Sequence, residues 1–306
     1  MHENKEIDLF RKTFRYYKSK NPPPKLCNVI DISSDKKHHL VECTNNNNQK
    51  SNLEVPNCPS CQRLGLKNHF LWQIFSFKSL KGFTVIKNPF NVAGQQKWIR
   101  KSLEVYPRNP SRTNLDSLNL KIDDIFPLHD KESWKTQTNV HKLRWATLGY
   151  HHNWDTKIYD ESERTEFPSC LKELTKHIAS CVGCENFEPE AAIINYYNKK
   201  STLGIHDDHS EKNHDAPLIS FSFGLTAILL MGTKLKTDEP FPLFLRSGDV
   251  VIMGGDSRLV YHAVPCIFKE NGNSLPFNSD EDKSWEPFNE YIKKSRINIS
   301  VRQVNE

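Results

Sequence analysis

The chain has 306 residues and a formal net charge of +5, with 37% hydrophobic and 26% charged residues. This composition is typical of a globular protein and excludes collagen-like, coiled-coil and wholly disordered chains. The longest nearly apolar run, residues 225–232, is far shorter than the roughly 20 residues of a membrane helix, so we expect no membrane span.

The positive charge lies in the first half of the chain. Residues 1–150 hold 25 Lys and Arg against 13 Asp and Glu, a net +12, whereas residues 151–306 hold 17 against 24, a net −7. A basic half is typical of proteins that contact nucleic acid and also of an ordinary solvated surface. The eight cysteines are irregularly spread and no apolar leader is visible, which favours a reduced, intracellular setting.

The first predicted element is a basic amphipathic helix over residues 6–19, where apolar side chains recur at helical spacing. It must end before the proline run at 22–24, because proline lacks the amide donor that a helix needs. Residues 21–70 are polar and irregular, and we expect no regular element there. Residues 1–75 are therefore interpreted as an N-terminal extension ahead of one large unit at 76–306.

The large unit begins with a strand at 82–86 and a helix at 93–106, followed by polar, turn-rich chain to residue 140. One more helix is predicted at 168–181. Short strands account for most of the rest, and we predict them at 144–150, 190–197, 203–208, 218–223, 226–231, 250–253, 259–264 and 296–304. Many short strands at close spacing favour a sandwich or barrel, so the second half is predicted to be a jelly roll.

A histidine and an aspartate stand two residues apart at His206 and Asp208. In an extended strand such side chains point to the same face, so the pair can offer a nitrogen and an oxygen to one cation. His262, in the apolar run 259–264, supplies a second imidazole. Two histidines and one carboxylate form the facial triad of non-haem iron(II) oxygenases, which leaves positions open for a co-substrate and dioxygen. The alternatives are a solvated loop for the pair and a core position for His262.

The segment 296–302 alternates strictly between polar and apolar residues, which is typical of a strand with one apolar face. Arg296, Asn298, Ser300 and Arg302 share the polar face. If this face points into a barrel, its guanidinium groups are suited to bind carboxylates through two parallel hydrogen bonds. The alternative is exposure of the polar face to solvent.

The order of these features resembles the AlkB family of iron(II)- and 2-oxoglutarate-dependent dioxygenases, and more narrowly its eukaryotic AlkB homologue 1 branch. The similar stretches are Ile194-Asn195-Tyr196-Tyr197, Ser201-Thr202-Leu203-Gly204-Ile205-His206, Ser220-Phe221-Ser222-Phe223-Gly224, Ser247-Gly248-Asp249 and the segment from Arg296 to Val304. The resemblance is close over residues 141–304 and fainter over 76–140. Before that it is confined to the helix at 10–17.

The resemblance implies an α+β fold: a double-stranded β-helix (jelly-roll) core at about 190–306, flanking helices, and a nucleotide-recognition lid at about 107–175. It implies Fe(II), 2-oxoglutarate and O2 as cofactor and co-substrates. By the same resemblance, the iron ligands are His206, Asp208 and His262. Arg296 would pair with the distal carboxylate of 2-oxoglutarate, Asn195 and Tyr197 would hydrogen-bond it, and Asn298 and Arg302 would line the side near the metal.

Aromatic residues alternate with basic and amide residues between 142 and 159, a composition that suits base stacking beside phosphate contact. In the AlkB family this segment leads into the lid. The predicted substrate contacts are Arg144, Tyr150, Asn153, Trp154 and Tyr159. Lys97, Arg100 and Lys101 would extend a phosphate track. The alternatives are packing in the core for the aromatic residues and a solvated surface for the basic ones.

The implied activity is oxidative demethylation of bases in nucleic acid with release of formaldehyde, succinate and CO2. The family branch suggests 6-methyladenine in unpaired or bulged DNA, and 1-methyladenine or 5-methylcytosine in transfer RNA, with nucleus, mitochondrion and cytoplasm as locations. Two alternatives stay open: a non-catalytic nucleic-acid-binding jelly roll, and a dioxygenase that acts on a methylated protein such as a histone. A monomer is the favoured oligomeric state.

Two Cys-x-x-Cys pairs, at Cys58 and Cys61 and at Cys181 and Cys184, need interpretation. The first pair could join Cys43 or His69 in a zinc site. No regular four-ligand spacing appears, however, so free thiols are the preferred interpretation.

Overall fold

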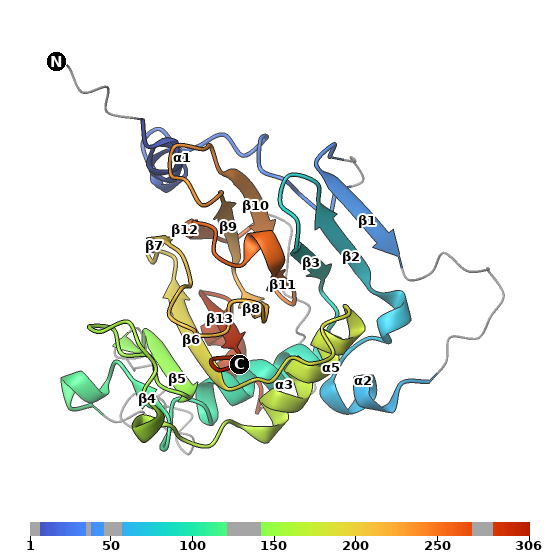
Figure 1. Ribbon diagram of the computed structural model, residues 1–306, viewed down its shortest axis with the longest axis vertical. Helices are drawn as coiled ribbons and strands as arrows, with labels where there is room; N and C mark the ends of the chain where they lie inside the picture. Colours follow the sequence, from blue (N-terminus) through green and yellow to red (C-terminus); the bar gives the residue numbers. More distant parts are fainter. Residues whose placement is uncertain (1–6, 35–37, 46–56, 121–141, 271–283) are drawn as a thin grey trace.

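The computed structural model describes residues 7–34, 38–45, 57–120, 142–270 and 284–306. Two antiparallel sheets pack face to face, as Figure 1 shows, and helices cover their outer sides. This arrangement confirms the predicted jelly-roll core.

The larger sheet has nine strands and the smaller has four. In spatial order the larger sheet contains β1 (Val41–Asn45), β2 (Gln73–Phe77), β3 (Phe83–Lys87), β11 (Val250–Met253), β8 (Leu218–Gly224), β13 (Ser295–Arg302), β6 (Ala191–Asn198), β5 (Trp145–Gly149) and β4 (Arg112–Thr113). The smaller sheet contains β10 (Phe241–Leu245), β9 (Thr226–Met231), β12 (His262–Phe268) and β7 (Leu203–His206). Short 3-10 helices lie at His69–Leu71, Asp116–Leu118, Glu161–Glu163 and Gly255–Ser257.

The inner faces of the two sheets enclose one apolar layer, to which the larger sheet contributes Tyr197 and Met253 and the smaller sheet Leu229 and Leu245. The chain crosses from the larger sheet to the smaller between β8 and β9, with Leu225 alone separating the two strands. This short connection keeps the two sheets close together at this point.

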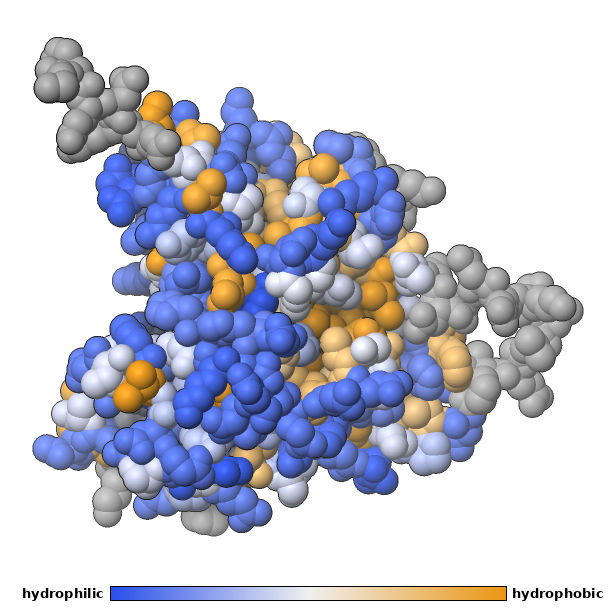
Figure 2. Space-filling model, in the orientation of Figure 1, coloured by the Kyte–Doolittle hydropathy of each residue, from blue (hydrophilic) through white to orange (hydrophobic). Residues whose placement is uncertain are grey.

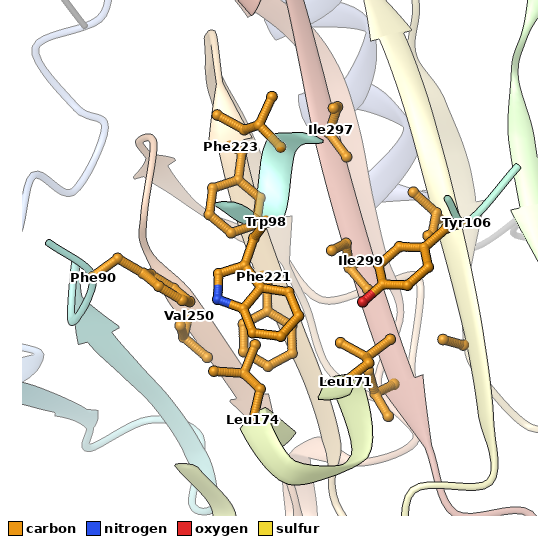
Figure 3. Packing of buried hydrophobic residues seen from close by; sticks show 14 of the residues in the cluster. Phe90, Trp98, Tyr106, Leu171, Leu174, Phe221, Phe223, Val250, Ile297 and Ile299 are labelled. Atoms are coloured by element: carbon orange, nitrogen blue, oxygen red, sulfur yellow. The ribbon is translucent and has the colours of Figure 1, made fainter. Parts of the chain in front are cut away.

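Helices α3 (Val92–Glu104), α5 (Ser169–Cys181) and α6 (Glu286–Ile292) pack on the outer face of the larger sheet. Trp98 of α3 is fully buried there against Phe221 of β8 and Leu174 of α5 (Figure 3). The N-cap of α3 is Asn91, whose Oδ1 accepts a hydrogen bond from Gly94 N at 2.7 Å. None of the helices in these described ranges is long and apolar enough to cross a membrane.

Helix α1 (Leu9–Lys18) covers the outer face of the smaller sheet and confirms the helix predicted near the N-terminus. Asp8 caps it, since Oδ1 accepts a hydrogen bond from Arg11 N at 2.7 Å. Phe10 has no exposed surface and its ring lies against Gly232, where a Cβ atom would approach the ring within 2.6 Å. The apolar face of α1 therefore packs on the smaller sheet of the same chain.

The structure differs from the sequence expectations mainly before residue 76. Residues 21–70 were expected to lack regular elements, but β1 lies there at the edge of the larger sheet and α2 (Pro59–Leu64) packs against α3. The expected boundary at residue 75 falls inside β2. Short, polar edge elements escape detection because their pairing partners, and not their own pattern, stabilise them.

Further along the chain, β4, β10 and α6 were not predicted, and the strand expected at 259–264 is β12 at His262–Phe268. The lid predicted at about 107–175 includes residues 121–141, which lie outside the described residues. Its described part holds β4, β5 and the beginning of α5.

We expect Phe10→Ala to lower the free energy of unfolding by about 3 kcal/mol, because it empties a fully buried aromatic position between α1 and the smaller sheet. Ile7→Ala is the control, since Ile7 is 70% exposed and its change should stay within about 0.5 kcal/mol. Urea denaturation would measure both. Equal effects of the two substitutions would contradict the docking of α1 as part of the core.

Candidate metal centre and substrate cleft

Two adjacent strands of the smaller sheet place two histidines opposite each other. His206, the last residue of β7, is the register partner of His262, the first residue of β12, and their ring centroids are 4.2 Å apart. Asp208 follows in the loop after β7. Ligand atoms of these three residues all lie within 4.8 Å of one another, which is close enough to bind a single cation.

Both imidazoles are oriented by backbone carbonyl groups. His206 Nδ1 lies 2.9 Å from the carbonyl oxygen of Gly204, and His262 Nδ1 lies 3.1 Å from that of Val260. A carbonyl oxygen only accepts hydrogen bonds, so Nδ1 carries the proton and Nε2 keeps its lone pair for a metal. Burial lowers the pKa of His206 to about 4, so this ring is neutral at pH 7, as a ligand must be.

Asp208 is held as a carboxylate by Arg302. Arg302 Nη2 donates to Asp208 Oδ1 at 2.9 Å, while Asp208 Oδ2 lies 3.4 Å from His262 Nε2. Burial alone would raise the pKa of Asp208, but the Arg302 guanidinium holds this pKa well below its usual value. One oxygen of the carboxylate is thus anchored and the other faces the two histidines.

The alternation of β13 directs its polar side chains inward. Ile297, Ile299 and Val301 pack with the helices on the outer face, so Arg296 and Asn298 face the interior of the sandwich. The pairing with β6 sets Arg296 opposite Tyr197 and Asn298 opposite Asn195.

Arg296 is a buried cation, 1% exposed, with uncharged hydrogen-bond partners. Its Nη2 donates to Ser222 Oγ at 2.8 Å and its Nη1 to the Leu225 carbonyl at 3.4 Å, and within the described residues its Nε has no hydrogen-bond partner. Burial lowers the pKa of Arg296 to about 10, so the group is still charged at pH 7. A buried guanidinium with an unused donor fits a carboxylate ligand.

All eight residues predicted to bind iron or 2-oxoglutarate line one small cavity of about 60 Å³ between the sheets. The structure thus brings together Asn195, Tyr197, His206, Asp208, His262, Arg296, Asn298 and Arg302. Two imidazole nitrogens and a carboxylate at one end suit iron(II), and a buried guanidinium at the other end suits the distal carboxylate of 2-oxoglutarate. The donor set therefore fits both groups.

A larger open cleft of about 510 Å³ adjoins this cavity and shares His206, Asp208 and Arg302 with it. Three aromatic side chains line one side. The His152 ring lies 4.6 Å from Trp154 and 5.3 Å from Tyr159, measured between centroids. Polar residues cover most of the face of the molecule seen in Figure 2, and apolar ones gather mainly right of centre, away from β7 and β5.

Trp154 and Tyr159, two of the predicted substrate contacts, line the cleft, but the other three do not. Tyr150 is buried, and its hydroxyl bonds to Glu161 and Asn305. Asn153 Oδ1 accepts hydrogen bonds from two backbone amides of its own turn. Arg144 is exposed outside the cleft.

The predicted phosphate track on α3 is also not supported. This helix covers the outer face of the larger sheet, whereas the cavity lies on the inner face. Lys97 Nζ donates to the Arg63 carbonyl at 2.9 Å, and Arg100 lies over the Phe288 ring at 4.8 Å. These basic side chains serve packing between helices.

Glu211 stands in a polar stretch that is typical of a solvated loop, so the sequence pattern gives no sign of its role. Its carboxylate is buried and accepts hydrogen bonds from Arg258 Nη2 at 2.9 Å and from the Tyr159 hydroxyl at 3.0 Å, while Arg302 Nε lies 2.9 Å away. Glu211 thereby connects the aromatic side of the cleft to the arginine that holds Asp208.

We expect Glu211→Gln to lower the free energy of unfolding by about 3 kcal/mol, because it removes the carboxylate between two buried guanidinium groups. Glu163→Gln is the matched control: its ion pair with Arg112 is largely exposed, so the change should stay within about 0.5 kcal/mol. Urea denaturation checks both. A neutral effect at Glu211 would show that the network contributes nothing to stability.

Comparison with known proteins agrees with this geometry. The profile of the 2OG-Fe(II) oxygenase superfamily matches residues 82–302. The human protein "Nucleic acid dioxygenase ALKBH1" is 37% identical, with 97% of this chain and 84% of the human protein covered. "DNA N(6)-methyladenine demethylase ALKBH1A" of Arabidopsis thaliana is 36% identical, with 76% and 77% covered. "tRNA demethylase abh1" of Schizosaccharomyces pombe is 35% identical, with 76% and 82% covered.

The matched residues 82–302 include the whole cavity, from Asn195 on β6 to Arg302 on β13. Both the donor set and the sequence therefore lead to the same assignment. The chain belongs to the AlkB homologue 1 branch of the 2OG-Fe(II) oxygenase superfamily and is an iron(II)- and 2-oxoglutarate-dependent dioxygenase.

Proposed function

We propose that this dioxygenase oxidises the methyl group of a methylated base in nucleic acid. The substrates we propose are 6-methyladenine in unpaired DNA and methylated bases of transfer RNA. The observation that carries the proposal is the aromatic side of the cleft, which directly adjoins the metal centre. The printed names of the relatives, a nucleic acid dioxygenase, a DNA 6-methyladenine demethylase and a tRNA demethylase, support it.

The cleft suits a single base taken out of its stack. An enzyme that acts on a base must reach it unpaired and then hold it between aromatic or apolar side chains. Trp154 is 40% exposed and lies beside His152, so its ring can stack on a base that enters from solvent. Because His206 and Asp208 line both spaces, a base bound in the cleft lies next to the metal ligands.

Two exposed lysines at the cleft suit the phosphates on either side of such a base. Lys157 lies 5.9 Å from the Trp154 ring, and Lys236 lies 4.5 Å from the Tyr261 ring, measured from Nζ to the centroid. Both belong to the acidic second half of the chain. The charge excess of residues 1–150 therefore does not locate the cleft, although it adds to the general attraction for a polyanion.

In this reaction iron(II) and 2-oxoglutarate, when bound, supply the oxidant from O2, with succinate and CO2 as the co-products. The side chains of this protein position the metal, the co-substrate and the base. We assign Arg296 to the distal carboxylate of 2-oxoglutarate and the three ligands to iron. An N-methyl group that gains a hydroxyl becomes an unstable hemiaminal and leaves as formaldehyde, so the net result is demethylation.

The proposed substrate is tested with the full chain, iron(II) and 2-oxoglutarate on total transfer RNA and on methylated DNA in single-stranded, bulged and duplex form. Mass spectrometry of nucleosides should show loss of the methylated base with formaldehyde release, and His206→Ala or Asp208→Ala should abolish it. Binding without decarboxylation of 2-oxoglutarate, or preferential demethylation of a histone peptide, would contradict the proposal.

Trp154→Ala should raise KM for the oligonucleotide about tenfold, since one stacking contact contributes about 1–3 kcal/mol. Tyr150→Phe is the control, because the Tyr150 hydroxyl bonds to Glu161 and Asn305 outside the cleft, and KM should stay unchanged. Steady-state kinetics of both variants checks this. An equal KM for Trp154→Ala and the wild type would show that Trp154 does not contact the substrate.

Arg296→Lys should raise KM for 2-oxoglutarate about tenfold, because an ammonium group cannot donate two parallel hydrogen bonds to a carboxylate. Arg144→Lys, at an exposed position outside the cavity, should leave it unchanged. The measurement is the rate of succinate formation against 2-oxoglutarate concentration. A KM that does not respond to Arg296→Lys would reject the assignment of this arginine to the co-substrate.

A further inference from the structure

A second cluster of metal-binding side chains lies on the opposite side of the larger sheet from the iron centre. It is formed where α2 and the 3-10 helix at His69–Leu71 meet α5, a neighbourhood visible at the lower right of Figure 1. Cys58, Cys61 and His69 form the cluster, and His177 of α5 lies against Cys61. None of these residues lines the cavity or the cleft.

The two sulfur–nitrogen distances at Cys61 lie on either side of the value expected in a tetrahedral zinc site. Ligand atoms of Cys58, Cys61 and His69 lie within 4.8 Å of one another. Cys61 Sγ lies 3.9 Å from His69 Nδ1 and 3.2 Å from His177 Nε2. With Zn–S of about 2.3 Å and Zn–N of about 2.0–2.1 Å, a tetrahedron separates sulfur from nitrogen by about 3.6 Å.

The backbone orients the two sulfur atoms toward the same side. Cys58 precedes α2 and its Sγ accepts a hydrogen bond from Cys61 N at 3.4 Å, which closes the turn Cys58-Pro59-Ser60-Cys61. Gly65 ends the helix with φ of +74° and lies directly against Gly94 of α3. A Cβ atom on Gly94 would come within 1.9 Å of the Gly65 carbonyl oxygen. The turn is therefore fixed by packing against α3.

The cluster is partly enclosed, with Cys61 buried and Cys58, His69 and His177 half-buried. Cys61 is 1% exposed, and the buried Trp72 ring lies 6.3 Å from the His69 ring and 6.4 Å from the His177 ring, edge on in both cases. Two thiolates, two neutral imidazoles and one Zn²⁺ sum to zero charge, which makes burial of the ion favourable. Zinc binding would release the two thiol protons to solvent.

We propose that Cys58, Cys61, His69 and His177 bind a structural zinc ion that fastens the segment at 58–71 to α5. All four positions are then protein ligands, which is typical of a structural site and not of a catalytic one. The ion would link segments more than a hundred residues apart in the sequence, and such a cross-link stabilises the folded chain by restricting the unfolded one.

His177 is the ligand that the sequence could not reveal, since it lies far from Cys61 along the chain. Cys181, one turn later on α5, lies 3.9 Å from His177 Nε2 and is the competing fourth ligand. We assign His177 because its Nε2 is the nitrogen nearest to Cys61 Sγ.

The first test is the zinc content of the full chain by inductively coupled plasma mass spectrometry. His206→Ala with His262→Ala serves as the background, so that zinc in the iron site is not counted. We expect about one zinc per chain there, loss of it in Cys58→Ser with Cys61→Ser, and retention in Cys170→Ser. No zinc in the background, zinc retained without Cys58 and Cys61, or a disulfide between these two would overturn the proposal.

The second test reports the geometry of the bound metal directly. Cobalt(II) added to the metal-free background protein should give the intense d–d bands of a tetrahedral site and thiolate-to-cobalt charge-transfer absorption. His177→Ala should abolish the tetrahedral bands, whereas Cys181→Ser should keep them; the reverse result would overturn the assignment of the fourth ligand. Removal of zinc by a chelator should lower Tm by several degrees, and an unchanged Tm would reject the structural role.

Discussion

The strict alternation of β13 is the constraint on which the rest of the structure depends. Its apolar side chains fill the layer beneath α3 and α5, so the polar ones must face the space between the sheets. A shift by one residue would bury Arg296 and Arg302 under the helices and expose the isoleucines to the cavity. Packing of the apolar β13 residues against the helices therefore also determines that the two arginines face the cavity.

The two arginines differ in what surrounds them, and this difference separates their roles. Arg302 lies between the carboxylates of Asp208 and Glu211, which raise its pKa although burial would lower it. Its charge is satisfied within the protein, so Arg302 positions Asp208 while its side chain also lines the cavity. Arg296 has a hydroxyl and a carbonyl as partners, and its pKa falls to about 10 on burial. Its charge is available to a ligand.

Sequence patterns could predict what is encoded locally. The close spacing of short strands predicted the jelly roll. The spacing of His206 and Asp208, the alternation of β13 and the order of the motifs identified eight residues that line one cavity. Sequence patterns did not reveal residues whose role depends on a partner far away in the sequence. Glu211 looks like a loop residue until Arg258 and Arg302 are placed beside it, and His177 looks like an ordinary helix position until Cys61 faces it.

The aromatic segment shows why composition alone could not identify the substrate side chains. Asn153 closes a turn whose backbone amides bond to its side chain, and this turn folds Tyr159 back onto His152. Trp154 and Tyr159 thereby line the cleft, whereas Tyr150, before the turn, does not, although Tyr150 and Tyr159 share one small buried cluster with Val304. Both tyrosines are buried and both bond to a glutamate. Only the geometry of the turn determines which of the two faces the metal centre.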